Sequence, residues 1–133
     1  MGLSFASKKL DEEIGRHCVA ELGGGCPRLL DDETYIRDAL VEAARKSGAT
    51  LLNITSHKFH PQGVTAIALL AESHISFHSW PEKGYVAIDA FTCGTHCDPE
   101  VAIKHLKETF RLSHGHINTF DRVIPRQSVL TCP

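Results

Sequence analysis

The 133-residue sequence lacks an excess of charge of either sign, and it lacks any long apolar run. Its formal net charge is −2, and its lysines and arginines form no basic stripe, which argues against a nucleic-acid partner. No segment approaches the roughly 20 apolar residues that a membrane-spanning helix needs. Residues 1–15 are mixed and charged, without the apolar centre of a signal peptide. We therefore expect a cytoplasmic protein that binds neither nucleic acid nor membrane.

Internal repeats and linker-like segments are also missing, so we expect one domain over residues 1–133. A chain of this length can bury roughly two thirds of the surface that it exposes when unfolded. The sequence contains five cysteines, an odd number that cannot all pair within one chain. In the absence of an export signal, we interpret them as reduced thiols.

The chain predicts an α+β domain. Apolar residues at helical spacing indicate two amphipathic helices, at 31–48 and 99–110. Runs of strand-forming residues between turn residues predict six strands, at 16–22, 49–59, 64–72, 74–80, 85–93 and 116–124. Strand, helix, four strands, helix, strand is an order typical of a largely antiparallel sheet with both helices packed on one face.

One predicted strand is apolar on both of its sides. Residues 64–71 read "VTAIALLA", and successive side chains of a strand point to opposite faces of the sheet. The helices can cover only one of these faces. We therefore expect a second subunit to cover the other, so that the sheets pair across a dimer.

Residues 71–94, "AESHISFHSWPEKGYVAIDAFTCG", place reactive groups on strands that should build the core. The plainest interpretation is structural, because strands often carry serine and histidine as satisfied polar groups. Metal binding is an alternative, since zinc needs three or four converging ligands. The candidates are His74, His78, Cys93, His96 and Cys97. The spacing Cys-x₂-His-Cys matches no common structural zinc site, so we predict no metal.

Ser73 is the candidate nucleophile, but no G-x-S-x-G turn surrounds it. The one carbonyl always within its reach is that of Glu72, the preceding residue. Attack there would convert the amide into an ester by an N→O acyl shift. Removal of the Ser73 α-proton would then split the chain by β-elimination, leaving a dehydroalanine that hydrolyses to a pyruvoyl group.

Three segments carry a resemblance to a known family: "GRHCVAEL", "LLDD" and "FHPQGVTAIALLAESHISFHSWPEKGYVAIDAFTCG". Over roughly residues 14–112, the chain resembles the short bacterial and archaeal S-adenosylmethionine decarboxylase proenzymes. The resemblance implies self-cleavage between Glu72 and Ser73, into a β chain of residues 1–72 and an α chain of residues 73–133. It also implies pyruvoyl-dependent decarboxylation of S-adenosyl-L-methionine to S-adenosylmethioninamine and CO₂, for spermidine biosynthesis.

The same resemblance implies roles for individual residues. Ser73 becomes the pyruvoyl group and forms a Schiff base with the substrate. His78 is the proton acceptor in processing, and Cys93 is the proton donor in catalysis. Thr65 stands where many members have a serine that assists processing, and it keeps the hydroxyl.

Two further residues match the family's substrate site. Phe59 matches an aromatic residue near the adenine, where a ring suits stacking and cation–π attraction, although it could equally be core. Glu82 matches an acidic residue suited to the ribose hydroxyls, although it could be solvated surface. We expect Trp80 to serve packing, and we assign His74 no role.

The family's fold is a sheet flanked by helices, and two αβ units pair as an (αβ)₂ homodimer. Strict strand alternation would put Ser73 and His78 on opposite faces, so a turn or bulge is expected near Ser73. Two alternatives remain. The chain could be a relative that decarboxylates arginine or ornithine, or an uncleaved regulatory pseudoenzyme subunit, although the intact Ser73, His78 and Cys93 argue against the latter.

Overall fold

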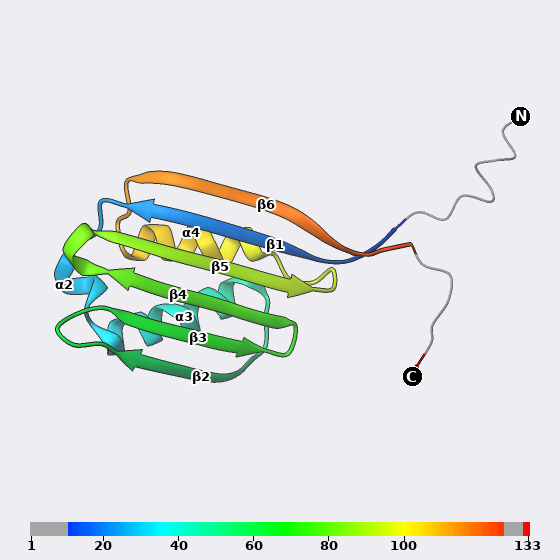
Figure 1. Ribbon diagram of the computed structural model, residues 1–133, viewed down its shortest axis with the longest axis horizontal. Coiled ribbons are helices and arrows are strands. Elements are labelled where there is room, and N and C mark those ends of the chain that lie inside the picture. The colour runs from blue at the N-terminus through cyan, green and yellow to red at the C-terminus, as the bar shows by residue number, and fades with distance from the viewer. Residues whose placement is uncertain (1–10, 127–131) are drawn as a thin grey trace, which may run out of the picture.

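The computed structural model describes residues 11–126 and 132–133, in which six strands form one sheet. The strand order is β2-β3-β4-β5-β1-β6, and every neighbouring pair is antiparallel (Figure 1). The strands are β1 (Glu12–Gly23), β2 (Leu51–Lys58), β3 (Val64–Leu70), β4 (Ser73–Trp80), β5 (Tyr85–Cys93) and β6 (His114–Ile124). The predicted α+β class with an antiparallel sheet is confirmed.

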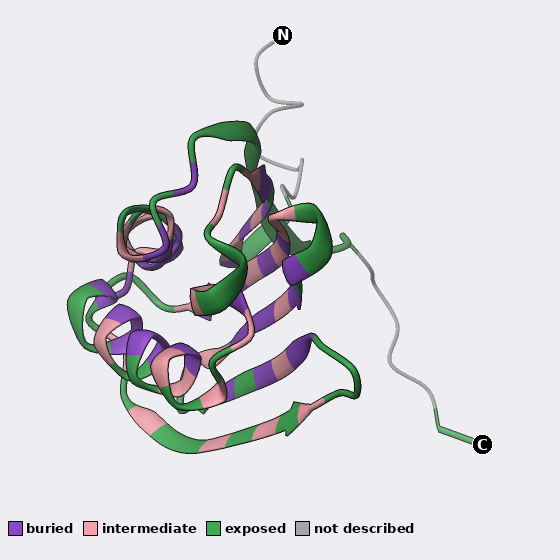
Figure 2. Cartoon of the chain, turned by 90° about the vertical axis from the view of Figure 1, so that its left-hand side faces the viewer, coloured by how far each residue is buried: buried purple, intermediate pink, exposed green. Residues whose placement is uncertain are grey.

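Two long helices, α3 (Glu33–Ser47) and α4 (Pro99–Thr109), lie on the same side of the sheet (Figure 2). Two short helical turns were not predicted: α2 (Pro27–Leu30) and the 3₁₀ helix η1 (Pro81–Lys83). Elements of three or four residues are too short to show a helical period, so the pattern could not reveal them. None of the helices in the described part of the chain has the length and apolar character needed to cross a bilayer.

The ends of the long helices are set by local chemistry. The Asp32 side chain accepts a hydrogen bond from the Tyr35 N–H at the start of α3, and Asp98 accepts one from the Glu100 N–H at the start of α4. Both satisfy backbone donors that a helix start leaves free. At the end of α3, Gly48 adopts a left-handed conformation with φ of 86°, which glycine tolerates best.

The two faces of β3 differ in cover. Side chains that point toward the helices are buried in the core, namely Val64, Ala66, Ala68 and Leu70. Between them, Ile67 and Leu69 point to the opposite face and remain 39% and 50% exposed. The strand is thus apolar on both sides, and among the described residues no element covers its second face. Pairing of two such faces in a dimer stays a prediction.

The first strand does not lie at an edge of the sheet. β1 pairs with β5 on one side and with β6 on the other, so that Cys18 lies opposite both Ala90 and Thr119. It begins at Glu12, earlier than the predicted Arg16, because the long partner strand β6 extends the pairing. An N-terminal strand is therefore inserted between two strands from the C-terminal half of the chain.

The aromatic centre of the core gives a stability prediction. The Phe110 ring is fully buried, 4.9 Å from the Phe77 ring and 5.3 Å from the Tyr35 ring between centroids. We expect Phe110→Ala to lower the free energy of unfolding by about 3–5 kcal/mol, because it removes apolar contacts and leaves a cavity. Urea denaturation would measure the loss.

The matched control is Val41→Ala on α3, where the side chain is 43% exposed. We expect this change to cost less than about 1 kcal/mol. A Phe110→Ala protein as stable as the control would show that this cluster does not hold the helices to the sheet.

Candidate active site

Ser73 lies at the exit of a tight turn. Only Ala71 and Glu72 separate β3 from β4, and Ser73 is paired with Leu70 across the turn. Its φ of 149° is a conformation that L residues rarely adopt. Such backbone strain costs about 1–3 kcal/mol, and it persists where the surrounding structure imposes it. The turn that strand alternation required near this serine is therefore present, and the serine itself is strained.

The peptide carbonyl before Ser73 is held by the neighbouring strand. The Cys93 N–H donates a hydrogen bond to the Glu72 carbonyl oxygen at 2.9 Å. A backbone N–H aimed at a carbonyl stabilises the negative charge that forms on the oxygen when a nucleophile attacks the carbon. Ser73 and Cys93 thus share one end of the sheet, and the end of β5 polarises the carbonyl next to Ser73.

The Glu72 side chain is fixed as well. Its carboxylate accepts hydrogen bonds from the Thr50 N–H at 2.9 Å and from His96 Nε2 at 2.8 Å. The Thr50 N–H, and then His96, hold the pKa of Glu72 below its ordinary value. The carbonyl and the carboxylate of this residue are therefore both anchored, which limits the motion of the peptide bond that follows it.

A buried hydroxyl lies beside the serine. Thr92 on β5 is paired with Ser73 on β4, and it is 1% exposed. Among the described residues, its Oγ1 has no hydrogen-bond partner. A buried hydroxyl left unpaired costs about 1–3 kcal/mol. The Thr92 hydroxyl therefore has an unused hydrogen-bonding capacity at the position paired with Ser73.

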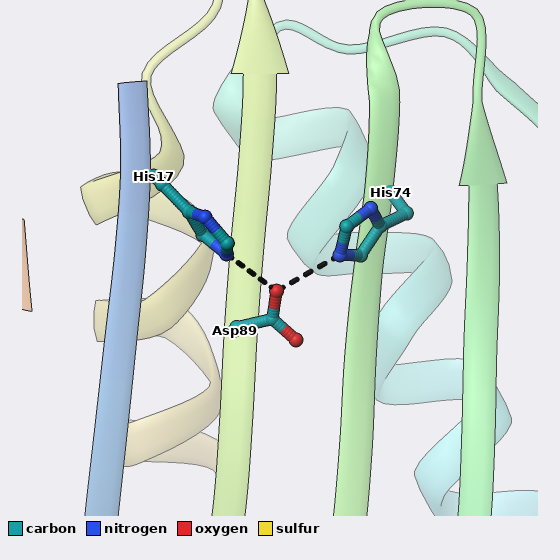
Figure 3. A group of neighbouring side chains, drawn as sticks. All are labelled: His17, His74 and Asp89. Atoms are coloured by element: carbon teal, nitrogen blue, oxygen red, sulfur yellow. Dashed lines mark hydrogen bonds and ion pairs between the residues drawn. The ribbon is translucent and has the colours of Figure 1, made fainter. Parts of the chain in front are cut away.

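Three strands bring His17, His74 and Asp89 together on the face away from the helices (Figure 3). His74 Nε2 lies 2.8 Å from Asp89 Oδ2, and His17 Nε2 lies 2.7 Å from the same oxygen. The Ser76 hydroxyl donates to Oδ1. Burial raises the pKa of Asp89, but hydrogen bonds from Ser76, His17 and His74 more than offset it, so the pKa lies below its ordinary value.

His74 also contacts the serine. Its Nδ1 lies 3.3 Å from Ser73 Oγ, so one imidazole links Ser73 to Asp89. No role for His74 was predicted from the sequence. Its adjacency to Ser73 was visible, but Asp89 is distant in the chain and reaches His74 only through the β4–β5 register, which pairs Ser76 with Asp89.

A second group of candidates gathers at the opposite end of the sheet. Thr65 and His78 are directly paired on β3 and β4, with Thr65 Oγ1 3.1 Å from His78 Nδ1. Both line a pocket of about 330 Å³ together with Phe59, Trp80 and Glu82. This volume is at the lower end of the range for small-molecule sites. Four residues singled out from the sequence, and Trp80, therefore meet in one pocket.

The structure does not bring Ser73 and His78 together within one chain. Both lie on the extended strand β4, and at about 3.3 Å of rise per residue their Cα atoms are about 16 Å apart. The candidate residues of one chain therefore form two separate groups, which we name the serine half-site and the histidine half-site. The serine half-site comprises Ser73 and Cys93, and the histidine half-site comprises Thr65, His78 and their pocket.

The residues weighed as zinc ligands are also divided. His74 is hydrogen-bonded to Asp89, whereas His96 is hydrogen-bonded to Glu72. The Cys97 thiol donates to the Gly48 carbonyl at 3.4 Å, and burial raises its pKa, which is the behaviour of a structural thiol. All five cysteines, each within the described residues, are free thiols.

Comparison with known proteins identifies the family. Residues 16–123 match the family model described as S-adenosylmethionine decarboxylase. An S-adenosylmethionine decarboxylase proenzyme from Synechococcus sp. (strain WH7803) is 49% identical over 112 residues, covering 84% of this chain and 88% of that protein. One from Methanococcus vannielii is 49% identical over 96 residues, covering 72% and 79%.

A solved structure agrees with the sequence comparison. The crystal structure of the adenosylmethionine decarboxylase from Aquifex aeolicus VF5 matches with a TM-score of 0.80 and 28% identity, covering 90% of this chain and 99% of that one. Family model, relatives and fold all lead to the same conclusion, which is that the chain belongs to the S-adenosylmethionine decarboxylase family.

Proposed function

We propose that this chain is a self-processing proenzyme that cuts itself between Glu72 and Ser73 and then decarboxylates S-adenosylmethionine through a pyruvoyl group made from Ser73. The product would be S-adenosylmethioninamine, the aminopropyl donor for spermidine synthesis, and the reaction would take place in the cytoplasm. The observation that carries the proposal is the Glu72–Ser73 junction. Its serine is strained, and its carbonyl accepts a hydrogen bond from the Cys93 N–H.

Processing follows from this junction. Attack of Ser73 Oγ on the Glu72 carbonyl relieves the unfavourable backbone conformation and places negative charge where the Cys93 N–H already points. Removal of the Ser73 α-proton from the resulting ester then separates residues 1–72 from residues 73–133. His78 is the residue that we assign to this second proton, assisted by the Thr65 hydroxyl 3.1 Å away.

The residues around Ser73 fit a pyruvoyl group. The unpaired Thr92 hydroxyl offers a hydrogen-bond donor beside the position where the new group would form. A pyruvoyl group supplies an electron sink for the electrons left on the substrate when CO₂ departs. To Cys93, partly exposed at the same end of the sheet, we assign the delivery of a proton to the substrate carbon.

The pocket at the histidine half-site supports substrate binding. Phe59 lines this pocket and is half exposed, with its ring 4.6 Å from the His57 ring between centroids. We assign its ring to stacking on an adenine or to attracting a sulfonium cation. Glu82, which lines the same pocket, offers a carboxylate to ribose hydroxyls. These two assignments depend on the pocket holding the substrate while its amine reaches Ser73.

A homodimer reconciles the two half-sites. In a two-fold symmetric interface, each residue pair is formed twice, once in each direction. Two uncovered sheet faces, which carry the exposed Ile67, Leu69 and Phe120, can therefore pack together with the His78 end of each subunit against the Ser73 end of its partner. We propose that an (αβ)₂ dimer assembles two composite sites in this way.

Cleavage of the chain is the first test of the proposed function. We expect cleavage of the wild-type protein at Glu72–Ser73 to yield two fragments. The fragment of residues 73–133 should be blocked to N-terminal sequencing. Ser73→Ala should remain one full-length chain, because no hydroxyl can attack the carbonyl. Intact-mass analysis distinguishes these outcomes, and Ser113→Ala, which removes an exposed hydroxyl elsewhere, should cleave normally.

Cleavage of the Ser73→Ala protein at the same bond would refute the proposed mechanism. Wild-type protein that never cleaves would indicate the pseudoenzyme subunit instead. For cleaved protein, CO₂ release from S-adenosylmethionine, arginine and ornithine in parallel identifies the substrate. Release from arginine or ornithine alone would overturn the substrate assignment but not the self-processing.

The composite site makes its own prediction. Ser73→Ala and His78→Ala chains should each remain uncleaved when produced alone. When they are co-expressed with different tags, a mixed dimer has one site with both the Ser73 of one subunit and the His78 of the other. We therefore expect the His78→Ala chain to be cleaved in mixed dimers, as seen on denaturing gels. Mixed dimers that form but contain no cleaved chain would contradict the composite site.

The last prediction here separates two roles for the Cys93 side chain. If it donates the proton, Cys93→Ala should fold and still be processed, because its backbone N–H remains. Turnover per pyruvoyl group should fall, each tenfold corresponding to about 1.4 kcal/mol of barrier. Protonation at the wrong carbon should also convert pyruvoyl to alanine, which mass spectrometry detects.

The matched control is Cys97→Ala, which removes a buried thiol that is hydrogen-bonded to the Gly48 carbonyl. We expect this variant to have a lower melting temperature with near-normal turnover. If Cys93→Ala shows that same pattern, its side chain is structural and another group must donate the proton.

A further inference from the structure

Ser73, His74 and Asp89 form a continuous hydrogen-bonded line within one chain. Ser73 Oγ lies 3.3 Å from His74 Nδ1, and His74 Nε2 lies 2.8 Å from Asp89 Oδ2. A hydroxyl, an imidazole and a carboxylate in this order are the arrangement by which proteins activate a serine. The strand pairing fixes all three, because Ser73 and His74 begin β4 and Asp89 lies on the adjacent β5.

The neighbours of Asp89 determine where the protons lie. An Arg122 Nη1 atom lies 2.9 Å from His17 Nδ1, and a guanidinium can only donate. His17 Nδ1 therefore accepts, and the proton of this neutral ring is on Nε2, directed at Asp89. Ser76 donates to the other carboxylate oxygen, so Asp89 acts as an acceptor on both sides.

The hydrogen-bond partners of His74 also determine where its ring proton lies. Its Nε2 faces the accepting oxygen of Asp89, so Nε2 carries the ring proton. In the neutral ring, Nδ1 then has a free lone pair, and this atom faces Ser73 Oγ. His74 is thus oriented, by a carboxylate that is itself held by His17 and Ser76, to accept a proton from the serine.

We propose that His74 is the base that takes the Ser73 hydroxyl proton in the N→O acyl shift, and that Asp89 is the residue that positions it. This inference rests on the proposed function, because it concerns the first step of processing. His78 of the same chain is about 16 Å from Ser73 along β4, so the proton of the hydroxyl has a nearer acceptor within the chain.

The step balances in atoms and electrons. Ser73 Oγ bonds to the Glu72 carbonyl carbon as its proton passes to His74 Nδ1, and the charge on the carbonyl oxygen meets the Cys93 N–H. The carbon–nitrogen bond then breaks, and the Ser73 nitrogen takes the proton back from His74. The product is an ester isomer of the chain with a free amine, and His74 is regenerated as a neutral ring.

Processing would therefore use two histidines for two different protons. His74 serves the hydroxyl proton from within the chain, and the partner's His78 serves the α-proton across the dimer. The two functions predict different stalled species. Loss of His78 should leave the ester, which hydroxylamine cuts, whereas loss of His74 should leave the amide, which hydroxylamine does not cut.

The experiment compares His74→Gln with His17→Gln, both in full-length precursor carrying His78→Ala. Each glutamine keeps an N–H that can donate to Asp89, but only the His74 change removes the acceptor facing Ser73. Hydroxylamine present from the start traps the ester as it forms, and cleavage at Glu72–Ser73 is followed on denaturing gels. The same pair in an otherwise wild-type chain reports unassisted cleavage.

We expect His74→Gln to slow the trapped cleavage by about 100-fold or more, the usual effect of losing a general base. His17→Gln should slow it by less than about tenfold, since its ring touches Asp89 but not the serine. Asp89→Asn should fall between them, because it leaves His74 in place with less control of its orientation. Melting curves confirm that the compared proteins are folded.

Two outcomes would overturn the assignment of His74. Trapped cleavage of His74→Gln at the rate of the His78→Ala parent would show that another group takes the proton. Equal slowing by His74→Gln and His17→Gln would show that both histidines only hold Asp89. A failure of the proposed function is a separate result, because wild-type precursor would then not cleave at Glu72–Ser73 at all.

Discussion

The pairing of β4 with β3 on one side and β5 on the other is the interaction on which the site depends. It places Ser73 at the two-residue turn, brings the Cys93 N–H to the Glu72 carbonyl, and aligns Thr65 with His78. Since side chains alternate between faces, a slip of one residue would turn every one of these groups to the wrong side. The tight turn and the buried alternate residues of β3 hold the register against such a slip.

The two faces of the sheet have different physical roles. One face packs against α3 and α4 and contains the apolar core. The other face carries His17, His74 and Asp89. It can hold these polar side chains because they are hydrogen-bonded to one another. Partly buried polar groups are tolerated when each has a partner, so this face can hold a reactive network and still be closed by a second subunit.

The sequence predicted the helices and strands because their apolar residues repeat with a helical or a strand period. The candidate residues Ser73, His78 and Cys93 came from a family resemblance, and their chemical roles stay predictions. The position of β1 between β5 and β6 was not predictable, because strand order depends on distant pairing that no local pattern records. For the same reason, the contact of His74 with Asp89 was missed, since the β4–β5 register decides which side chains meet.

The insertion of β1 also determines what a cut chain can do. The break at Glu72 would assign β1 to one fragment, while its neighbours β5 and β6 belong to the other. The fragments would then interleave and stay together after the covalent link is lost. Refolding from the denatured state would, however, become an encounter of two molecules, without the loop closure that one chain provides. We expect the cleaved enzyme to stay folded because it unfolds slowly. Its fold would form in the precursor, and the separated fragments would not readily recover it.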